Sequence, residues 1–137
     1  DVGKPYFVDL VDFRSADLVI ECGENYGDLY RYFQDQEVNV PYVAFEAGPD
    51  EFSVLTKNVD PGEIFEMALS DCKGTSNFFL NSTSADASLI DPVTSNGYLE
   101  VIVSTLSKVF SELESQSCTV LTLEAEVFGA RDFRRCT

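Results

Sequence analysis

The stretch from Gly97 to Phe128 constrains the fold most, because the spacing of its apolar residues changes part-way along it. In the first half, apolar residues recur at the i, i+3, i+4, i+7 spacing that predicts one buried face of a helix. These residues are Leu99, Ile102, Val103, Leu106, Val109, Phe110 and Leu113. From Cys118 onward apolar and polar residues alternate, which predicts a long strand with one buried face.

The rest of the chain predicts shorter elements. Strands are expected at 6–13, 18–22, 41–46, 52–56 and 78–80, and helices at 25–36 and 60–72. The strands at 41–46 and 52–56 are expected to form a hairpin around the Gly48-Pro49 turn. Asp60 before Pro61 favours a helix start over the rival interpretation, a Pro-Gly turn that enters a strand.

This mixed order of elements predicts the α+β class, with two or three helices packed on a mainly antiparallel sheet. The alternative is an all-β sandwich, which requires strands at both 60–72 and 98–103. The β-branched run Val101-Ile102-Val103 favours that alternative for the second segment.

Length and composition predict a single domain, 1–137. The 137 residues are 45% apolar, so folding can bury roughly 68–70% of the surface of the unfolded chain. No apolar run approaches the length of about 20 residues that a membrane-spanning helix needs, so no membrane insertion is expected. Because the chain starts at Asp1, we expect a mature protein from which a signal peptide has been removed.

The charge balance restricts the partners. The chain carries 24 acidic and 9 basic residues, a formal net charge of −15. This charge repels nucleic acid phosphates and anionic lipid headgroups, and it favours cations or basic protein partners. We therefore expect no nucleic acid partner.

The cysteines and one glycosylation motif point to secretion. Cys22, Cys72, Cys118 and Cys136 are widely spaced and the chain has no His, so two disulfides are favoured over a zinc site. Three pairings are possible, and the sequence does not choose between them. Asn81 begins an Asn-Ser-Thr acceptor for N-glycosylation. A secreted, extracellular protein is expected.

Catalysis has little support in the residue types. Without His the chain lacks the commonest general base and the usual nucleophilic triads, and only a carboxylate-dependent hydrolase remains as an enzymatic alternative. No resident cofactor is indicated other than calcium, which binds six to eight oxygen ligands. Two groups of acidic residues are candidates for it. They are Glu21, Glu24 and Asp28, and Asp50 with Glu51.

Two features suggest self-association. The strand at 6–13 is apolar on both faces and could pair with a neighbouring molecule, with Phe7, Val11 and Phe13 as its contact residues. The acidic chain also ends in a basic cluster, Arg131, Arg134 and Arg135, which suits head-to-tail contacts in an oligomer or filament.

The sequence thus favours a non-catalytic structural or interaction module, whose partner is another protein or a second copy. A secreted protein that binds a small ligand or calcium is the alternative.

Overall fold

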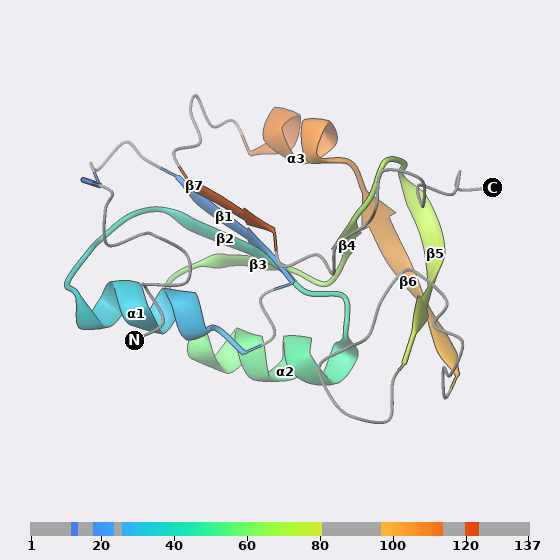
Figure 1. Ribbon diagram of the computed structural model, residues 1–137, viewed down its shortest axis with the longest axis horizontal. Coiled ribbons are helices and arrows are strands. Elements are labelled where there is room, and N and C mark those ends of the chain that lie inside the picture. Colours follow the sequence, from blue (N-terminus) through green and yellow to red (C-terminus); the bar gives the residue numbers. More distant parts are fainter. Residues whose placement is uncertain (1–11, 14–17, 24–25, 81–96, 114–119, 124–137) are drawn as a thin grey trace.

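The computed structural model describes residues 12–13, 18–23, 26–80, 97–113 and 120–123 (Figure 1). In these residues the chain forms three helices and two small sheets of mixed strand orientation, a small α+β fold as the sequence predicts. The elements are β1 (Val19–Cys22), α1 (Asp28–Asp35), β2 (Tyr42–Phe45), α2 (Pro49–Asn58), β3 (Glu63–Phe65), β4 (Ala68–Leu69), β5 (Gly74–Phe79), β6 (Tyr98–Ser104), α3 (Leu106–Glu112) and β7 (Val120–Leu123).

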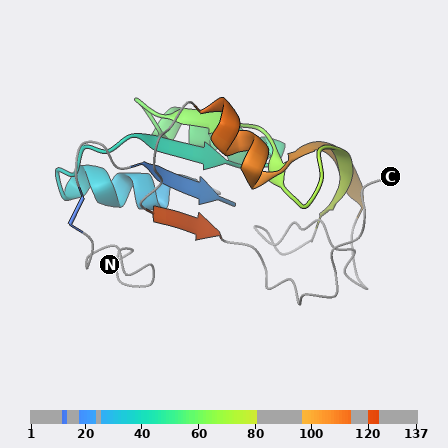
Figure 2. The ribbon, with the colours of Figure 1, turned by 90° about the horizontal axis from the view of Figure 1, so that it is seen from above.

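The larger sheet has the strand order β3-β2-β1-β7, and its neighbouring strands all run parallel. Helices α1 and α2 cover one face of this sheet and α3 covers the other (Figure 2). All four residues of β1 and of β2 are buried, which is typical of strands covered on both faces.

Two core clusters lie on the two faces of this sheet. On one face Val19 and Ala44 pack with Leu29 of α1 and Leu55 of α2. On the other face Ile20 of β1 and Val43 of β2 pack against Val109 of α3. The alternation along β1 therefore divides its side chains between two hydrophobic layers.

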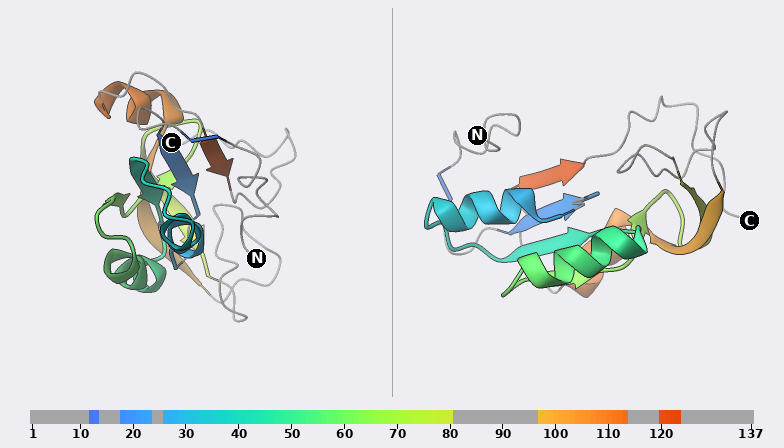
Figure 3. Two further views of the ribbon diagram at one scale, coloured as in Figure 1. Left: turned by 90° about the vertical axis from the view of Figure 1, so that its left-hand side faces the viewer. Right: turned by 90° about the horizontal axis from the view of Figure 1, so that it is seen from below.

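The smaller sheet has the order β4-β6-β5 and stands beside one end of the larger sheet (Figure 3). Strand β4 runs parallel to β6, whereas β5 runs antiparallel to it. A third cluster, built from Ala47, Phe78, Val101 and Val103, covers the inner face of this sheet.

The structure confirms the predicted elements at 18–22, 25–36, 41–46 and 78–80, and the described part of the strand after Cys118. The orientation of the strands differs from the expectation, because the larger sheet is parallel. Helices connect β1 to β2 and β2 to β3, and such crossovers join parallel neighbours. The three helices exclude the all-β sandwich.

The predicted hairpin at 41–56 is wrong in its second half, which forms helix α2. Pro49 occupies the first helical turn together with Asp50 and Glu51, and Lys57 lies in the last turn. Proline and acidic residues at the start of a helix, with a cation at its end, suit the helix dipole. These start and stop signals outweigh the alternation of Phe52, Val54 and Thr56.

The predicted helix at 60–72 is also wrong, since β3 and β4 lie there. Its supposed apolar face is divided between clusters: Ile64 packs beside α1 and α2, whereas Phe65 stacks on Phe45 with ring centroids 5.2 Å apart. The predicted helix from 99 onward begins only at Leu106, because the β-branched run before it forms β6. Thr105 caps this helix by accepting a hydrogen bond from the Lys108 amide.

Candidate functional site: the outer face of the smaller sheet

Alternation along β6 separates an inner from an outer side. Val101 and Val103 are 8% and 2% exposed and belong to the third core cluster. Tyr98 and Ile102 point to the opposite side and are 61% and 57% exposed. A strand with one buried face normally carries polar residues on its other face, so two large exposed apolar residues here are unusual.

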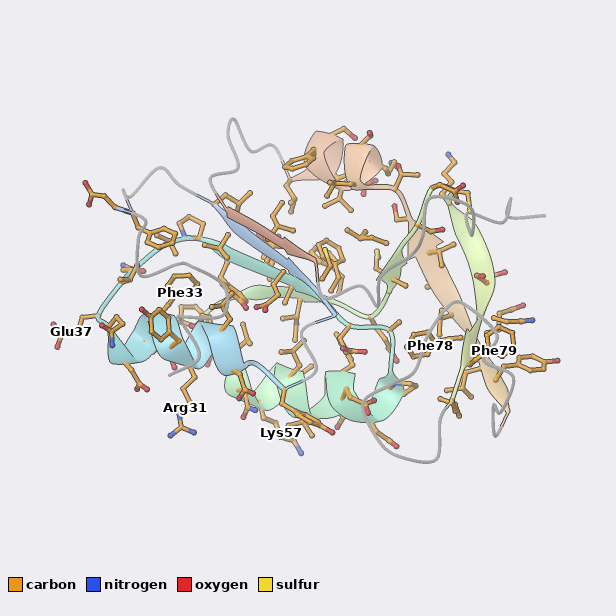
Figure 4. All side chains as sticks on the ribbon, in the orientation of Figure 1. Arg31, Phe33, Glu37, Lys57, Phe78 and Phe79 are labelled. Atoms are coloured by element: carbon orange, nitrogen blue, oxygen red, sulfur yellow. The ribbon has the colours of Figure 1, made fainter. Side chains whose placement is uncertain are left out.

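Strand β5 extends the same side. Its register places Phe79 opposite Tyr98, Asn77 opposite Glu100 and Thr75 opposite Ile102. We call these six residues the outer face. The rings of Phe79 and Tyr98 lie 6.1 Å apart between centroids, within the range of interacting aromatic pairs. Phe78 and Phe79 project to opposite sides of β5 (Figure 4).

One charged residue lies in the middle of the outer face. Glu100 follows Tyr98 by two positions and precedes Ile102 by two, so the three side chains form one row along β6. Its neighbour across the strand pair is the neutral Asn77. The outer face therefore combines apolar groups with a single negative charge.

Strand β5 also forms one edge of this sheet. The Leu80 amide donates a hydrogen bond to the Gly97 carbonyl at 2.9 Å. This bond shows which residue pairs between β5 and β6 are the hydrogen-bonded ones. Because hydrogen-bonded and non-hydrogen-bonded pairs alternate, the backbone groups of Thr75, Asn77 and Phe79 point away from β6. Within the described residues no other strand pairs with this side of β5.

A buried polar pair lies elsewhere, under helices α1 and α2. Tyr42 donates its hydroxyl hydrogen bond to Glu21, whose side chain is 1% exposed. Nearby, Tyr30 donates to the Pro61 carbonyl at 3.1 Å. Burial first, and then the negative charge of Asp60, raise the pKa of the Tyr30 phenol.

The calcium candidates fall in separate places. Glu21 is buried in the core, Asp28 is the exposed first residue of α1, and Glu24 is outside the described residues. Asp50 and Glu51 lie in the first turn of α2. Among the residues that the structure describes, no group of three or more His, Cys, Asp or Glu side chains is placed to hold a metal ion.

The described residues include only two of the four cysteines for which disulfides were predicted. Cys72 is disulfide-bonded, and Cys22, which is buried under α3, is not its partner. Cys118 and Cys136 lie outside the described residues, as does the glycosylation site Asn81. The pairing of the four cysteines therefore stays a prediction.

Most of the predicted self-association residues also lie outside the described residues. They are Phe7, Val11, Arg131, Arg134 and Arg135. Phe13 is described, and its ring packs edge-on against Phe33 of α1 with centroids 5.1 Å apart. The sequence did not predict the outer face. Tyr98 and Ile102 are residue types typical of a core, and only the strand register shows that they face outward.

Comparisons of the chain with protein family models, curated proteins and solved structures find no match. No helix in the described segments is long and apolar enough to cross a membrane.

Proposed function

We propose that this chain is a secreted, disulfide-bonded and glycosylated interaction module without catalytic activity, and that it binds a protein partner through the outer face. The observation that carries the proposal is the exposure of Tyr98 and Ile102, with the half-buried Phe79 beside Tyr98, on a sheet whose other side is packed. Grouped apolar side chains at a surface mark interaction sites more often than isolated ones do. The disulfide of Cys72 and the acceptor sequence at Asn81 support secretion.

The residue types of the outer face indicate what kind of surface the partner presents. Tyrosine and phenylalanine give large contact areas at a low cost in conformational entropy, and tyrosine is enriched where binding energy concentrates. Glu100 lies among these side chains, so a bound surface must supply a cation or leave the carboxylate buried and unpaired. The partner therefore presents apolar side chains around a Lys or Arg, and the net charge of −15 attracts such a basic surface.

Site-specific photo-crosslinking tests this proposal. A benzoylphenylalanine is placed at position 98, and a matched control carries it at Ser107, an exposed position on α3. Both proteins are irradiated in the extracellular fluid in which the chain is produced, and adducts are identified by mass spectrometry. We expect a defined adduct from position 98 alone, and we expect Glu100→Lys to abolish it. Equal labelling from both positions, or an adduct that Glu100→Lys leaves intact, would contradict the proposal.

A further inference from the structure

We propose that the edge of β5 that no other described strand covers pairs with β5 of a second copy of this chain, in an antiparallel and two-fold symmetric arrangement. This inference rests on the proposed function and deepens it, since the paired sheets join two outer faces into one binding surface. The occupant of the edge is thus the chain itself.

The first argument is the direction of the backbone groups of β5. Thr75, Asn77 and Phe79 direct their amide and carbonyl groups away from β6, as the register and the Leu80 hydrogen bond require. Natural edge strands are normally protected by charged side chains, proline, bulges or very short length. Strand β5 has six residues, Gly-Thr-Ser-Asn-Phe-Phe, and none of these protections.

The second argument is that β5 is self-complementary. If Asn77 faces Asn77 of the second copy, Thr75 of each copy faces Phe79 of the other. All three outward-directed residues then form hydrogen-bonded pairs, which gives about six hydrogen bonds between the two chains. The two Asn77 amides can donate to and accept from each other, and threonine opposite an aromatic ring is a favourable cross-strand pair.

The third argument is electrostatic, because a chain of charge −15 must avoid close like charges. Glu100 is the neighbour of Asn77 on β6, so the two Glu100 residues of the dimer are three strand spacings apart. At about 4.8 Å per spacing this separation is roughly 14 Å. The Debye length at physiological ionic strength is about 8 Å, so most of this repulsion is screened.

The geometry also sets the size of the assembly. A two-fold contact uses the same edge on both copies and closes on itself. The opposite edge of the smaller sheet is β4, which has only two residues, Ala68 and Leu69. The smaller sheet therefore gives a dimer rather than a filament.

Cysteine cross-linking tests this register. In Asn77→Cys the two introduced sulfurs face each other across the axis, where hydrogen-bonded pairs place Cα atoms about 5.5 Å apart, within disulfide range. In the matched control, Thr75→Cys, each new cysteine faces Phe79 instead. We expect mild oxidation to give a covalent dimer with Asn77→Cys and little with Thr75→Cys. Equal cross-linking of the two variants would overturn the proposed register.

Light scattering during size-exclusion chromatography tests the dimer without cysteines. We expect the mass of the wild-type chain to rise with concentration from 15.2 kDa plus glycan toward twice that value. Asn77→Lys places like charges opposite each other and should raise the dissociation constant about fivefold, whereas Thr75→Lys does not create this pair. A monomer at every concentration, or equal dissociation of both variants, overturns the inference. Neither outcome affects adducts at position 98, so the proposed function is judged separately.

Discussion

Replacing Tyr42 by phenylalanine removes one hydroxyl group from the core between the larger sheet and helices α1 and α2. The phenol donates a hydrogen bond to Glu21, and the two side chains are 3% and 1% exposed. The ring itself packs against Tyr30 and Phe33, with centroids 5.0 and 6.2 Å away. Phenylalanine keeps these ring contacts, so the substitution isolates the hydroxyl group.

The expected loss of stability follows from the kind of hydrogen bond. Removing one partner of a buried hydrogen bond costs about 1–3 kcal/mol, and the Glu21 side chain that loses this donor is 1% exposed. With a urea m-value of about 2 kcal/mol/M, from the usual range of about 1–3, this loss moves the unfolding midpoint down by about 1 M. The m-value itself should not change, because the native surface stays the same.

Equilibrium unfolding in urea, followed by circular dichroism, measures this shift. Tyr32→Phe is the matched control: Tyr32 is half-buried beside the same cluster, and its change should stay within about 0.5 kcal/mol. The reasoning is refuted if the two variants unfold at the same urea concentration. A shift of 1 M for Tyr42→Phe alone would establish that the buried carboxylate depends on this donor.

Three further predictions concern the backbone, the pH dependence and the cysteines. Gly27 has φ +90°, and a Cβ there would lie 3.2 Å from two side chains. In the same urea assay, Gly27→Ala should therefore lower the unfolding free energy by more than about 1–2 kcal/mol. The pKa of Tyr30 is raised above its ordinary value of 10.0, so its stabilisation is complete below that pH and is lost as the pH rises through the folded-state pKa. Tyr30→Phe should therefore unfold with a flatter pH dependence in alkaline urea titrations than the wild type. Peptide mapping without reduction should find Cys72 joined to a cysteine other than Cys22, and a peptide linking these two would contradict the structure.

The sequence predicts well those segments whose local pattern and long-range packing agree. Strand β1 lies inside the larger sheet and ends before a glycine, as the alternation along 18–22 predicts, although Glu21 is buried together with its apolar neighbours. Helix α1 has buried side chains at Leu29, Tyr30 and Phe33, which match the i, i+3, i+4 spacing read from the sequence. In both elements one assignment satisfies spacing and burial together.

The errors fall where two spacings fit the same residues. Val103, Leu106 and Val109 continue one helical face, and yet Val101 and Val103 also alternate as in a strand. The structure divides the segment at Thr105. The Thr105 side chain accepts a hydrogen bond from the Lys108 amide and so caps the start of helix α3. A threonine three residues before that amide was a usable signal, as was proline with two acids at the start of α2. Local start signals were more informative here than the apolar spacing.

The outer face could not be predicted from the sequence for a different reason: the residue types on β6 do not indicate which side of the sheet each side chain faces. Ile102 and Val103 are adjacent, similar in size and both β-branched, but Ile102 is mostly exposed and Val103 is buried. Only the register against β5, and the packing of Phe78 on the inner side, separate them. A shift of one residue in this register would exchange the two faces. The proposed binding surface therefore depends on how β5 pairs with β6. The cysteine at position 77 on β5 and the photo-crosslinker at position 98 on β6 lie on the same side of the sheet only in this register.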